Sequence, residues 1–404
     1  MKNKRGIKLL TIFFLITITT ILYGYINIQN DPFYLYQWGL QNNGKLSLKQ
    51  DVLQNNNTIE YFDVNISNNA FYGQDYNKMY FTNINDQSYV LAKAGVDIDY
   101  AEAYDLYNAV TSKQEIIIAV IDSGIDINHY ELKNSIWINN DEIPANGIDD
   151  DKNGYIDDVC GYNFYDNNPY VYLSEVDDIH GTHTAGIIAA EHDNGGIKGI
   201  AYNTQKTIKI MPLKILGENE KGKVASLIQA IKYAHDNGAK ICNISLGCYT
   251  QEPELESIIK GYSDMLFVVA AGNGARFIGY NIDERPVYPA SYNFLNLITV
   301  STLSFDGTAY VSGNYGLSVD VYAPGSYILS TAPNNRFGYL TGTSIACPFV
   351  TGICAMMWSS NPNLNPQKIK KIILDTVDKN DNLNGFCFSG GSINAYKALY
   401  DAIQ

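Results

Sequence analysis

Three short motifs contain residue types that can carry out acyl transfer to a serine hydroxyl. That chemistry needs a nucleophile, a base that takes its proton, and a carboxylate that fixes the tautomer of the base and stabilises the imidazolium. Asp122, His180 and Ser344 supply these groups, in that order along the chain. They lie in the glycine-containing motifs VIDSGID (120–126), HGTHTAG (180–186) and GTSIACP (342–348). Glycine lets the backbone approach a substrate closely, so together the motifs predict a nucleophilic serine centre.

Short apolar runs and helical patterns alternate after residue 114. The runs are rich in β-branched residues, as in strands covered on both faces, and we expect strands at Glu115–Ile121, Ile208–Ile215, Ile241–Ser245, Met265–Ala271 and Leu297–Ser301. Helices are expected at Thr184–His192, Ala225–Asn237, Pro253–Tyr262, Ser344–Ser359 and Pro366–Val377. The alternation predicts an α/β domain with a mostly parallel sheet.

In such a sheet, ligands bind beyond the carboxyl ends of the strands. Asp122, the segment Ser245-Leu246-Gly247 and Asn273 each follow or end an expected strand, so they are predicted to lie near one another. Each also has a simpler interpretation when taken alone. A serine before a helix, such as Ser344, is most often a helix N-cap, and the asparagine of an Asn-Gly pair is often a left-handed turn residue.

The three motifs resemble those of the subtilisin-like serine proteases, or subtilases, over about Asp31–Gly44 and Gly95–Ala402. The resemblance, with the thermitase-like branch in particular, implies a three-layer α/β fold in which helices flank a mostly parallel sheet. It implies a serine endopeptidase that hydrolyses peptide bonds through an acyl-enzyme. In the motif HGTH the first histidine is then the base, so His183 is structural, and Asn273 donates to the oxyanion.

The resemblance also implies where a peptide substrate binds. Ser245-Leu246-Gly247 corresponds to the segment that pairs with the substrate and lines one wall of the S1 pocket, and Ala271-Gly272 corresponds to the opposite wall. Gly222, between Lys221 and Lys223, corresponds to the segment on the other side of the substrate. Small walls favour a large apolar P1 side chain.

Two groups of acidic residues indicate structural Ca²⁺. The resemblance implies a first site formed by Asp31, Glu131 and Asp193. A second site is predicted in the acidic segment IDDDKNGYIDD (148–158), which repeats the first half of an EF-hand loop but lacks its closing glutamate. Its expected ligands are Asp149, Asp151, Asn153, Asp157 and Asp158. The alternative is a solvated acidic loop.

Composition and the N-terminus limit the location and the partners. With 46% hydrophobic residues the chain of 404 residues can bury a large core, and its net charge of −14 argues against nucleic acid or anionic lipid as a partner. Residues 1–25 have a basic start and an apolar run, as in an export signal. We therefore expect a monomer that is secreted, or anchored through residues 7–25 at the extracellular face of a membrane. A buried helix is the alternative.

Residues 26–404 are expected to form a single peptidase domain with a polar insertion at about 45–92, which has no sustained period and contains at most a hairpin. The six cysteines form no metal-like C-x-x-C pair, and free buried thiols are favoured over disulfides. We expect the enzyme to become active without the removal of the N-terminal pro-domain that is usual in the family, since Asp31 is already expected to belong to the mature fold. Two other functions remain open: a processing protease for one partner that uses 45–92 as an exosite, and a catalytically inactive peptide-binding subtilase.

Overall fold

The computed structural model describes residues 31–42, 44, 47–49, 61–65, 70–72, 89–217, 221–274 and 278–404. The predicted export segment, residues 1–25, lies outside the described residues, as does most of the predicted insertion. The chain begins here with a short 3-10 helix, η1 (Pro32–Tyr36), and a second one, η4 (Asp381–Leu383), lies near its end.

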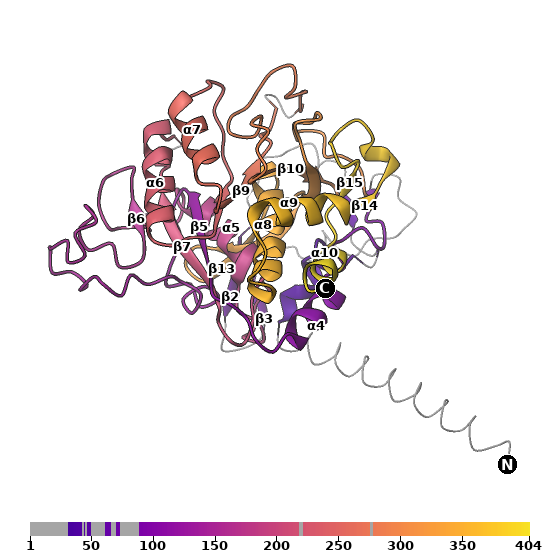
Figure 1. Cartoon of the computed structure of the whole chain (residues 1–404). Helices are drawn as coiled ribbons and strands as arrows, with labels where there is room; N and C mark the ends of the chain where they lie inside the picture. Colours follow the sequence, from indigo (N-terminus) through magenta and orange to yellow (C-terminus); the bar gives the residue numbers. More distant parts are fainter. Residues whose placement is uncertain are drawn as a thin grey trace, which may run out of the picture.

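A nine-stranded sheet forms the centre of the molecule, in the order β14-β15-β11-β10-β9-β8-β5-β7-β6 (Figure 1). Neighbouring strands are parallel except for β14 and β15, which pair antiparallel. The strands are β5 (Ile116–Asp122), β6 (Tyr162–Asn163), β7 (Ile208–Lys214), β8 (Ile241–Ile244), β9 (Leu266–Ala270), β10 (Leu297–Leu303), β11 (Val321–Pro324), β14 (Asp378–Lys379) and β15 (Gly391–Ser392). The predicted α/β class and mostly parallel sheet are confirmed.

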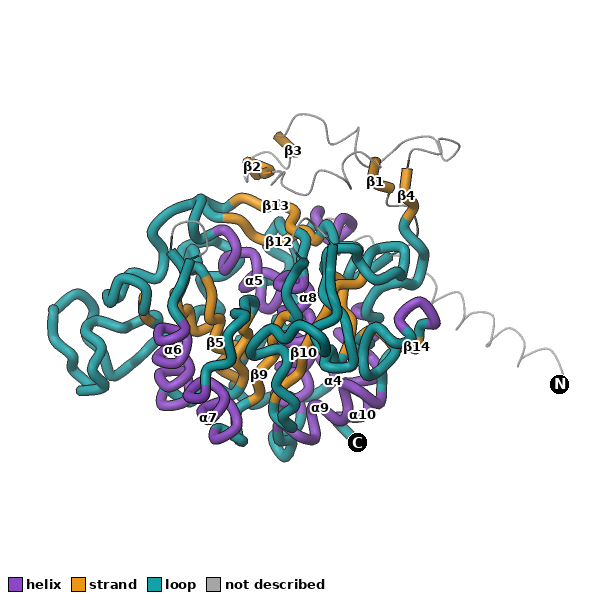
Figure 2. The backbone as a smooth tube through the Cα atoms, turned by 90° about the horizontal axis from the view of Figure 1, so that it is seen from above, coloured by secondary structure: helices purple, strands orange, loops and turns teal. Residues whose placement is uncertain are grey.

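Helices cover both faces of this sheet, so the fold has three layers (Figures 1 and 2). Alternate residues of β5 belong to the two layers: Ile118 and Val120 pack with the core that includes α8, whereas Ala119 and Ile121 pack with the core that includes α6 and α7. The helices are α4 (Tyr100–Ala109), α5 (Ile179–Ala189), α6 (Val224–Asp236), α7 (Pro253–Gly261), α8 (Thr343–Ser360), α9 (Pro366–Asp375) and α10 (Ala395–Ala402). A strand buried on both faces needs apolar residues at successive positions, and this explains the run IIIAVI.

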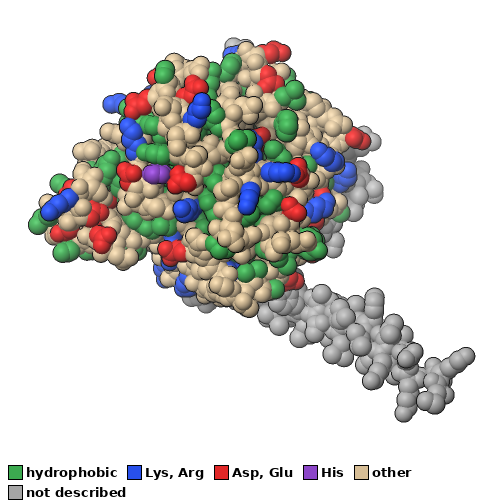
Figure 3. Space-filling model, viewed as in Figure 1, with side chains coloured by type: hydrophobic (Ala, Val, Ile, Leu, Met, Phe, Trp, Pro, Cys, Tyr) green, Lys and Arg blue, Asp and Glu red, His purple; other side chains and the backbone are tan. Residues whose placement is uncertain are grey.

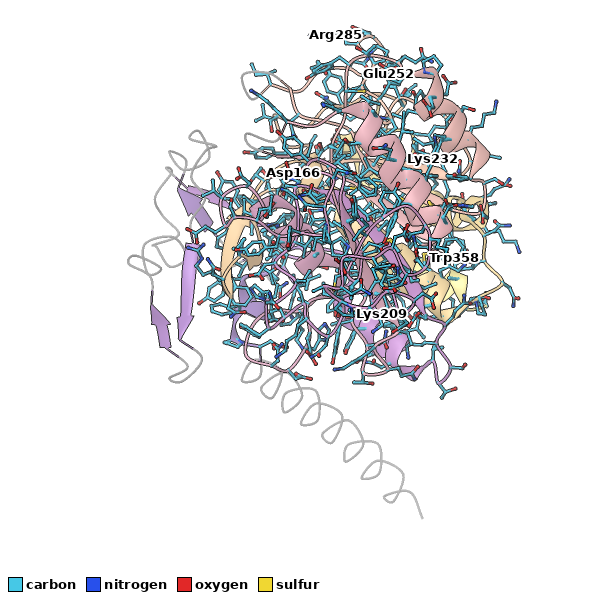
Figure 4. The ribbon with its side chains drawn as sticks, turned by 90° about the vertical axis from the view of Figure 1, so that its left-hand side faces the viewer. Asp166, Lys209, Lys232, Glu252, Arg285 and Trp358 are labelled. Carbon is cyan, nitrogen blue, oxygen red and sulfur yellow. The ribbon has the colours of Figure 1, made fainter. Side chains whose placement is uncertain are left out.

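Helix α8 is the central helix of the larger core. Its length and hydropathy would suit a membrane span, but 89% of it is buried inside the protein. Trp358, near the end of α8, is 5% exposed (Figure 4). By comparison, the side chain of Lys232 on the outer helix α6 is 46% exposed. The apolar composition of α8 is therefore that of a core helix.

A smaller antiparallel sheet has the order β12-β13-β2-β3. Strands β12 (Ile328–Ala332) and β13 (Arg336–Leu340) form a hairpin that packs on α5, and β2 (Tyr61–Asn65) with β3 (Ala70–Tyr72) extends it. A separate pair joins β1 (Ser47–Lys49) and β4 (Tyr89–Leu91). The described parts of the predicted insertion thus include a hairpin, β2–β3, that adds to a sheet at the surface (Figure 2).

Candidate active site

Asp122 is the last residue of β5 and is 1% exposed. Its carboxylate lies against the ring of His180, with Nδ1 of the histidine 2.8 Å and 3.0 Å from the two carboxylate oxygens. The side chain of His180 is 16% exposed. A buried carboxylate is therefore hydrogen bonded to an imidazole that still reaches solvent.

His180 is the second residue of α5 because the helix begins earlier than predicted, at Ile179 rather than Thr184. The start of the helix packs directly on the loop after β5. A β-carbon on Gly181 would lie 2.2 Å from the carbonyl oxygen of Gly124, and the Gly181 N–H donates to Ser123 Oγ at 3.1 Å. Glycine is required at position 181 because any side chain would push His180 away from Asp122.

His183 lies about one turn further along the same helix and is fully buried. Its Nε2 lies 3.0 Å from the carbonyl oxygen of Ile328 and 3.1 Å from that of Gly338. Burial lowers the pKa of His183 to about 3. As predicted, it is a structural histidine: it ties α5 to the β12–β13 hairpin.

Ser344 is the second residue of α8, and the N-cap position belongs to Gly342. The N-cap interpretation of Ser344 is therefore wrong. Asn273 has a negative φ, unlike its neighbour Gly272 at φ +84°, so it is not a left-handed turn residue either. Its Oδ1 accepts the Thr343 N–H at 3.1 Å, and this bond leaves the Nδ2 donor for another partner.

Both side chains flank the backbone of Gly342. A β-carbon built there would lie 3.1 Å from Ser344 Oγ and 3.2 Å from Asn273 Nδ2. The hydroxyl of one residue and the amide donor of the other are thus close in space although they are distant in sequence. Ser245 Oγ donates a hydrogen bond to the backbone carbonyl oxygen of Ser344 at 2.8 Å, and this bond fixes the backbone of Ser344.

His180, Asn273 and Ser344 line one cleft of about 490 Å³. Of the predicted substrate-binding residues, five also line it: Gly222, Ser245, Leu246, Gly247 and Gly272. Ala271 does not. It is fully buried in the core below the cleft, because alternate residues of a strand face opposite sides, and Ala270 lines the cleft instead.

Sequence reasoning missed several residues of this cleft. Val287 and Tyr288 lie opposite Gly247, and Asn314 lies beside Gly272. These residues belong to the long connections around β10, where no motif marks them. The amide of Asn314 donates to the carbonyl oxygen of Ala271 at 3.0 Å, so it fixes the loop that carries Asn273.

A compact acidic group lies in the loop between β5 and β6, which extends from the body of the molecule (Figures 1 and 3). Carboxylate oxygens of Glu142, Asp151 and Asp158 all lie within 4.8 Å of one another. Glu142 and Asp158 are buried, and Glu142 Oε2 has no hydrogen-bond partner. Burial raises the pKa of Asp158. A buried, unpartnered oxygen that faces two further carboxylates fits a bound cation.

Glu142 was not among the predicted ligands, and three predicted ones have other contacts. Asp149 accepts the backbone N–H groups of Asn153 and Gly154, and Asp157 accepts those of Asn146 and Gly147. The side-chain amide of Asn153 donates to Asp151 and Asp158 at 2.9 Å and 3.0 Å. The half EF-hand pattern therefore forms the turn, and the acidic group is closed by Glu142 from outside the pattern.

The first predicted cation site has a different geometry. Asp31 and Glu131 are fully buried, whereas the side chain of Asp193 is 55% exposed. Asp31 accepts the N–H groups of Asp193 and Asn194 at 2.7 Å and 3.1 Å, and the ammonium of Lys198 lies 3.5 Å away. Burial raises the pKa of Glu131. The first cation site stays a prediction, with Asp193 as its most exposed residue.

All six cysteines are free. Cys242, Cys347 and Cys354 are fully buried, and burial raises their pKa values, so they remain protonated packing residues. The six thiols are free, as predicted, but Cys160 and Cys248 are only partly buried.

Comparison with known proteins agrees with the fold and the cleft. Residues 113–391 match the Subtilase family (Peptidase_S8). The chain is 34% identical over 360 residues to a thermophilic serine proteinase of Bacillus sp. (strain AK1), covering 88% of this chain and 76% of that one. It is 35% identical over 265 residues to the major intracellular serine protease of Bacillus subtilis (strain 168), covering 65% and 74%.

Among solved structures, a chain from a study of the assembly of the subtilase cytotoxin SubAB matches with a TM-score of 0.59 and 25% identity, over 75% of this chain and 96% of that one. The motifs, the three-layer fold and the matches over most of the chain agree with one another. The chain belongs to the subtilase family and is a serine endopeptidase.

Proposed function

We propose that the chain hydrolyses peptide bonds with Ser344 as nucleophile, His180 as general base and Asp122 as the carboxylate that orients the base. The observation that carries this proposal is the Asp122–His180 hydrogen bond at the edge of a cleft that Ser344 and Asn273 also line. With Nδ1 bound to the carboxylate, Nε2 is the ring nitrogen that can take the proton of Ser344.

The reaction then has two halves. Ser344 Oγ attacks the scissile carbonyl while His180 takes its proton, and the protonated ring gives that proton to the leaving amine. The acyl-enzyme is hydrolysed by water through the same proton transfers. Asn273 Nδ2 is available to stabilise the oxyanion, since its Oδ1 is engaged by the Thr343 N–H, and the first turn of α8 favours negative charge at the same place.

Labelling with a fluorophosphonate probe tests the nucleophile. The native chain should be labelled and should cleave peptides, and Ser344→Ala should do neither. Ser263→Ala is the matched control, because Ser263 is exposed and lies outside the cleft. Peptide cleavage by the Ser344→Ala chain at the native rate would refute the assignment. It would also argue against a catalytic role for the cleft, because Ser344 lines that cleft.

Asn273→Ala should keep the labelling but lose turnover. Removal of the corresponding amide donor in a subtilisin lowers kcat by about 10²–10³, and a loss of this size with an unchanged KM is expected here, since the donor acts on the transition state. A larger rise of KM than fall of kcat would instead assign Asn273 to ground-state binding.

We propose that the substrates are extended peptides with a large apolar P1 side chain. Gly247 and Gly272 both line the cleft without a side chain, and Val287 is an apolar contact near both. Cleavage of a peptide library should give the P1 preference directly. Activity on casein as well as on short peptides would separate a general endopeptidase from a protease dedicated to one partner, which would cut the partner alone.

We propose that structural Ca²⁺ binds at Glu142, Asp151 and Asp158. When bound, the ion would neutralise three carboxylates that lie within 4.8 Å of one another and would hold the β5–β6 loop against α6, from which Tyr233 donates to Asp158 at 2.5 Å. The support is the unpartnered Glu142 Oε2. Oxygen ligands on a loop suit Ca²⁺ better than Mg²⁺. Isothermal titration of the metal-free chain with Ca²⁺ and Mg²⁺ tests both occupancy and selectivity.

We propose that the protein acts outside the cytoplasm, either secreted or held by residues 7–25. The basic start and apolar run of residues 1–25 support this proposal. Mass spectrometry of the active protein from its host tests it: a first residue between about 24 and 31, or an intact N-terminus in the membrane fraction, is expected. An intact N-terminus in the cytoplasmic fraction would contradict it. A mature N-terminus beyond Ala92 would instead make the preceding residues a pro-segment.

A further inference from the structure

Lys214 and Asp178 form a buried ion pair beside the catalytic residues. The ammonium of Lys214 is 2.5 Å from Asp178 Oδ1, and the side chains are 1% and 0% exposed. Lys214 is the last residue of β7, and Asp178 lies directly before α5. Neither residue lines the cleft, and no motif of the sequence marks either of them.

The pair connects the two elements that carry Asp122 and His180. Lys214 is paired in register with Asp122 across β7 and β5, and its ammonium also donates to the carbonyl oxygen of Ser123. Ser123 in turn donates its N–H to Asp122 Oδ1 at 2.6 Å. On the other side, Asp178 lies two residues before His180. One ammonium group therefore contacts the residue after the catalytic carboxylate and the residue at the start of the catalytic helix.

Asp178 is also held on its second oxygen. Oδ2 accepts the N–H groups of Leu173 and Ser174 at 2.5 Å and 2.9 Å, so the carboxylate fixes the loop that leads into α5. A β-carbon on Gly124 would lie 2.5 Å from Asp178 Oδ1, so the loop after β5 packs tightly against the pair. The position of the carboxylate is thus set from three directions: from Lys214, from its own loop and from the loop after Asp122.

Stability alone does not account for such a pair. The desolvation of two charges usually cancels their attraction, and apolar replacements of buried pairs are often neutral or stabilising. Catalysis, in contrast, is sensitive to geometry, because a misplacement of about 1 Å can lower the rate by about 10²-fold. We propose that Lys214 and Asp178 are positioning residues that set the distance and orientation between Asp122 and His180. This inference rests on the proposed roles of those two residues.

The test compares this pair with a second buried pair remote from the cleft. Lys370 and Asp320 lie 2.9 Å apart, with side chains 12% and 11% exposed, and neither lines the cleft. The variants are Lys214→Met, the double variant Lys214→Met/Asp178→Asn, and the control Lys370→Met/Asp320→Asn. The double variants leave no unpaired buried charge, so they decide the question if Lys214→Met does not fold.

For Lys214→Met/Asp178→Asn we expect a kcat lowered by about 10- to 100-fold, a KM within about threefold of native, and a melting temperature close to that of the control. The control should keep kcat and KM within about twofold. A kcat loss no larger than that of the control would overturn the inference and leave the triad untouched. If the native chain itself were not labelled by a fluorophosphonate, the proposed triad would fail instead, so the two failures are distinguishable.

Discussion

The carboxylate of Asp31 has the ammonium of Lys198 3.5 Å away, whereas the carboxylates of Glu142, Asp151 and Asp158 have one another within 4.8 Å. Both regions bury acidic groups under a surface loop. In the first, the chain supplies the positive charge itself, from a lysine that is 5% exposed. In the second, the contacts are amide groups, backbone N–H groups and the Tyr233 hydroxyl.

The difference indicates which region depends on a metal ion. Neutral donors reduce the repulsion between carboxylates but do not neutralise their charge. The carboxylate of Asp31 is therefore expected to be balanced without added cation, and the group around Glu142 to need one. Four changes test this comparison.

The largest effect is expected for Lys198→Met. Removal of one partner of a buried ion pair costs about 3–5 kcal/mol, since the remaining charge is left uncompensated, and we expect the free energy of unfolding to fall by about 3 kcal/mol. Urea unfolding in millimolar Ca²⁺ measures it. Lys232→Met is the control, because that lysine pairs only at the surface. A stability equal to native would mean that the ammonium does not balance Asp31.

Removal of Ca²⁺ should have the next largest effect. Binding to the folded chain alone stabilises by about 2.7 kcal/mol at a hundredfold excess over the dissociation constant, so chelation should lower the melting temperature and speed autolysis. Glu142→Gln should abolish most of this response. Identical melting temperatures in excess chelator and in millimolar Ca²⁺ would contradict the site, provided that tightly bound metal has been shown to be removed.

Asp149→Asn should have a smaller effect on the same loop. Its carboxylate accepts two backbone N–H groups of the turn, and an asparagine oxygen can accept one of them, so a loss of about 1 kcal/mol is expected. The response to Ca²⁺ should persist. Asp149→Asn could instead abolish the response to Ca²⁺ as fully as Glu142→Gln does. The ligands would then be the EF-hand-like set predicted from the sequence, and not Glu142, Asp151 and Asp158.

The smallest effect is expected for Asp193→Asn. This side chain is 55% exposed and lies 3.8 Å from the Lys198 ammonium, and such pairs contribute about 0–1 kcal/mol. The melting temperature should change little, both with and without Ca²⁺. A large loss of stability that appears only in the presence of Ca²⁺ would show that Asp193 is a ligand. A metal ion would then bind near Asp31 in addition to the Lys198 ammonium.

The sequence predicted the layout of the fold because buried parallel strands have a local signature. The run IIIAVI and its counterparts are apolar at successive positions, and the five strands that were predicted match the structure to within two residues at either end. The short strands β6, β11, β14 and β15 of the same sheet were not predicted. The start of α5 was misplaced by five residues, from Thr184 to Ile179. Its first turn contains HGTH, which has the composition of a loop, and its helical conformation depends on packing against the loop after β5.

Site residues that lie in motifs could be predicted from the sequence, and those outside motifs could not. Asp122, His180, Ser344 and Asn273 are marked by motifs, and the structure brings their side chains to one cleft or its edge. Ala271 was assigned to the wrong face, since the sequence does not show how a strand is rotated about its axis. Glu142 lies before the predicted segment 148–158, and the acidic pair that it forms with Asp141 was the available signal. Lys198 and Lys214 could not be assigned, because their partners are distant in sequence.

The strand order β10-β9-β8-β5-β7 has a consequence for the timing of activity during folding. Parallel neighbours must be joined across long connections, and such non-local contacts form slowly. Helix α8, which carries the proposed nucleophile Ser344, packs on β8, β9, β10 and β11, so its docking requires a sheet assembled from strands as far apart as 241–244 and 321–324. A growing or half-folded chain has its carboxylate, imidazole and hydroxyl on separate pieces. We therefore expect proteolytic activity only when folding is nearly complete. Before that point a chain can be cleaved by other proteases but cannot itself cleave a peptide.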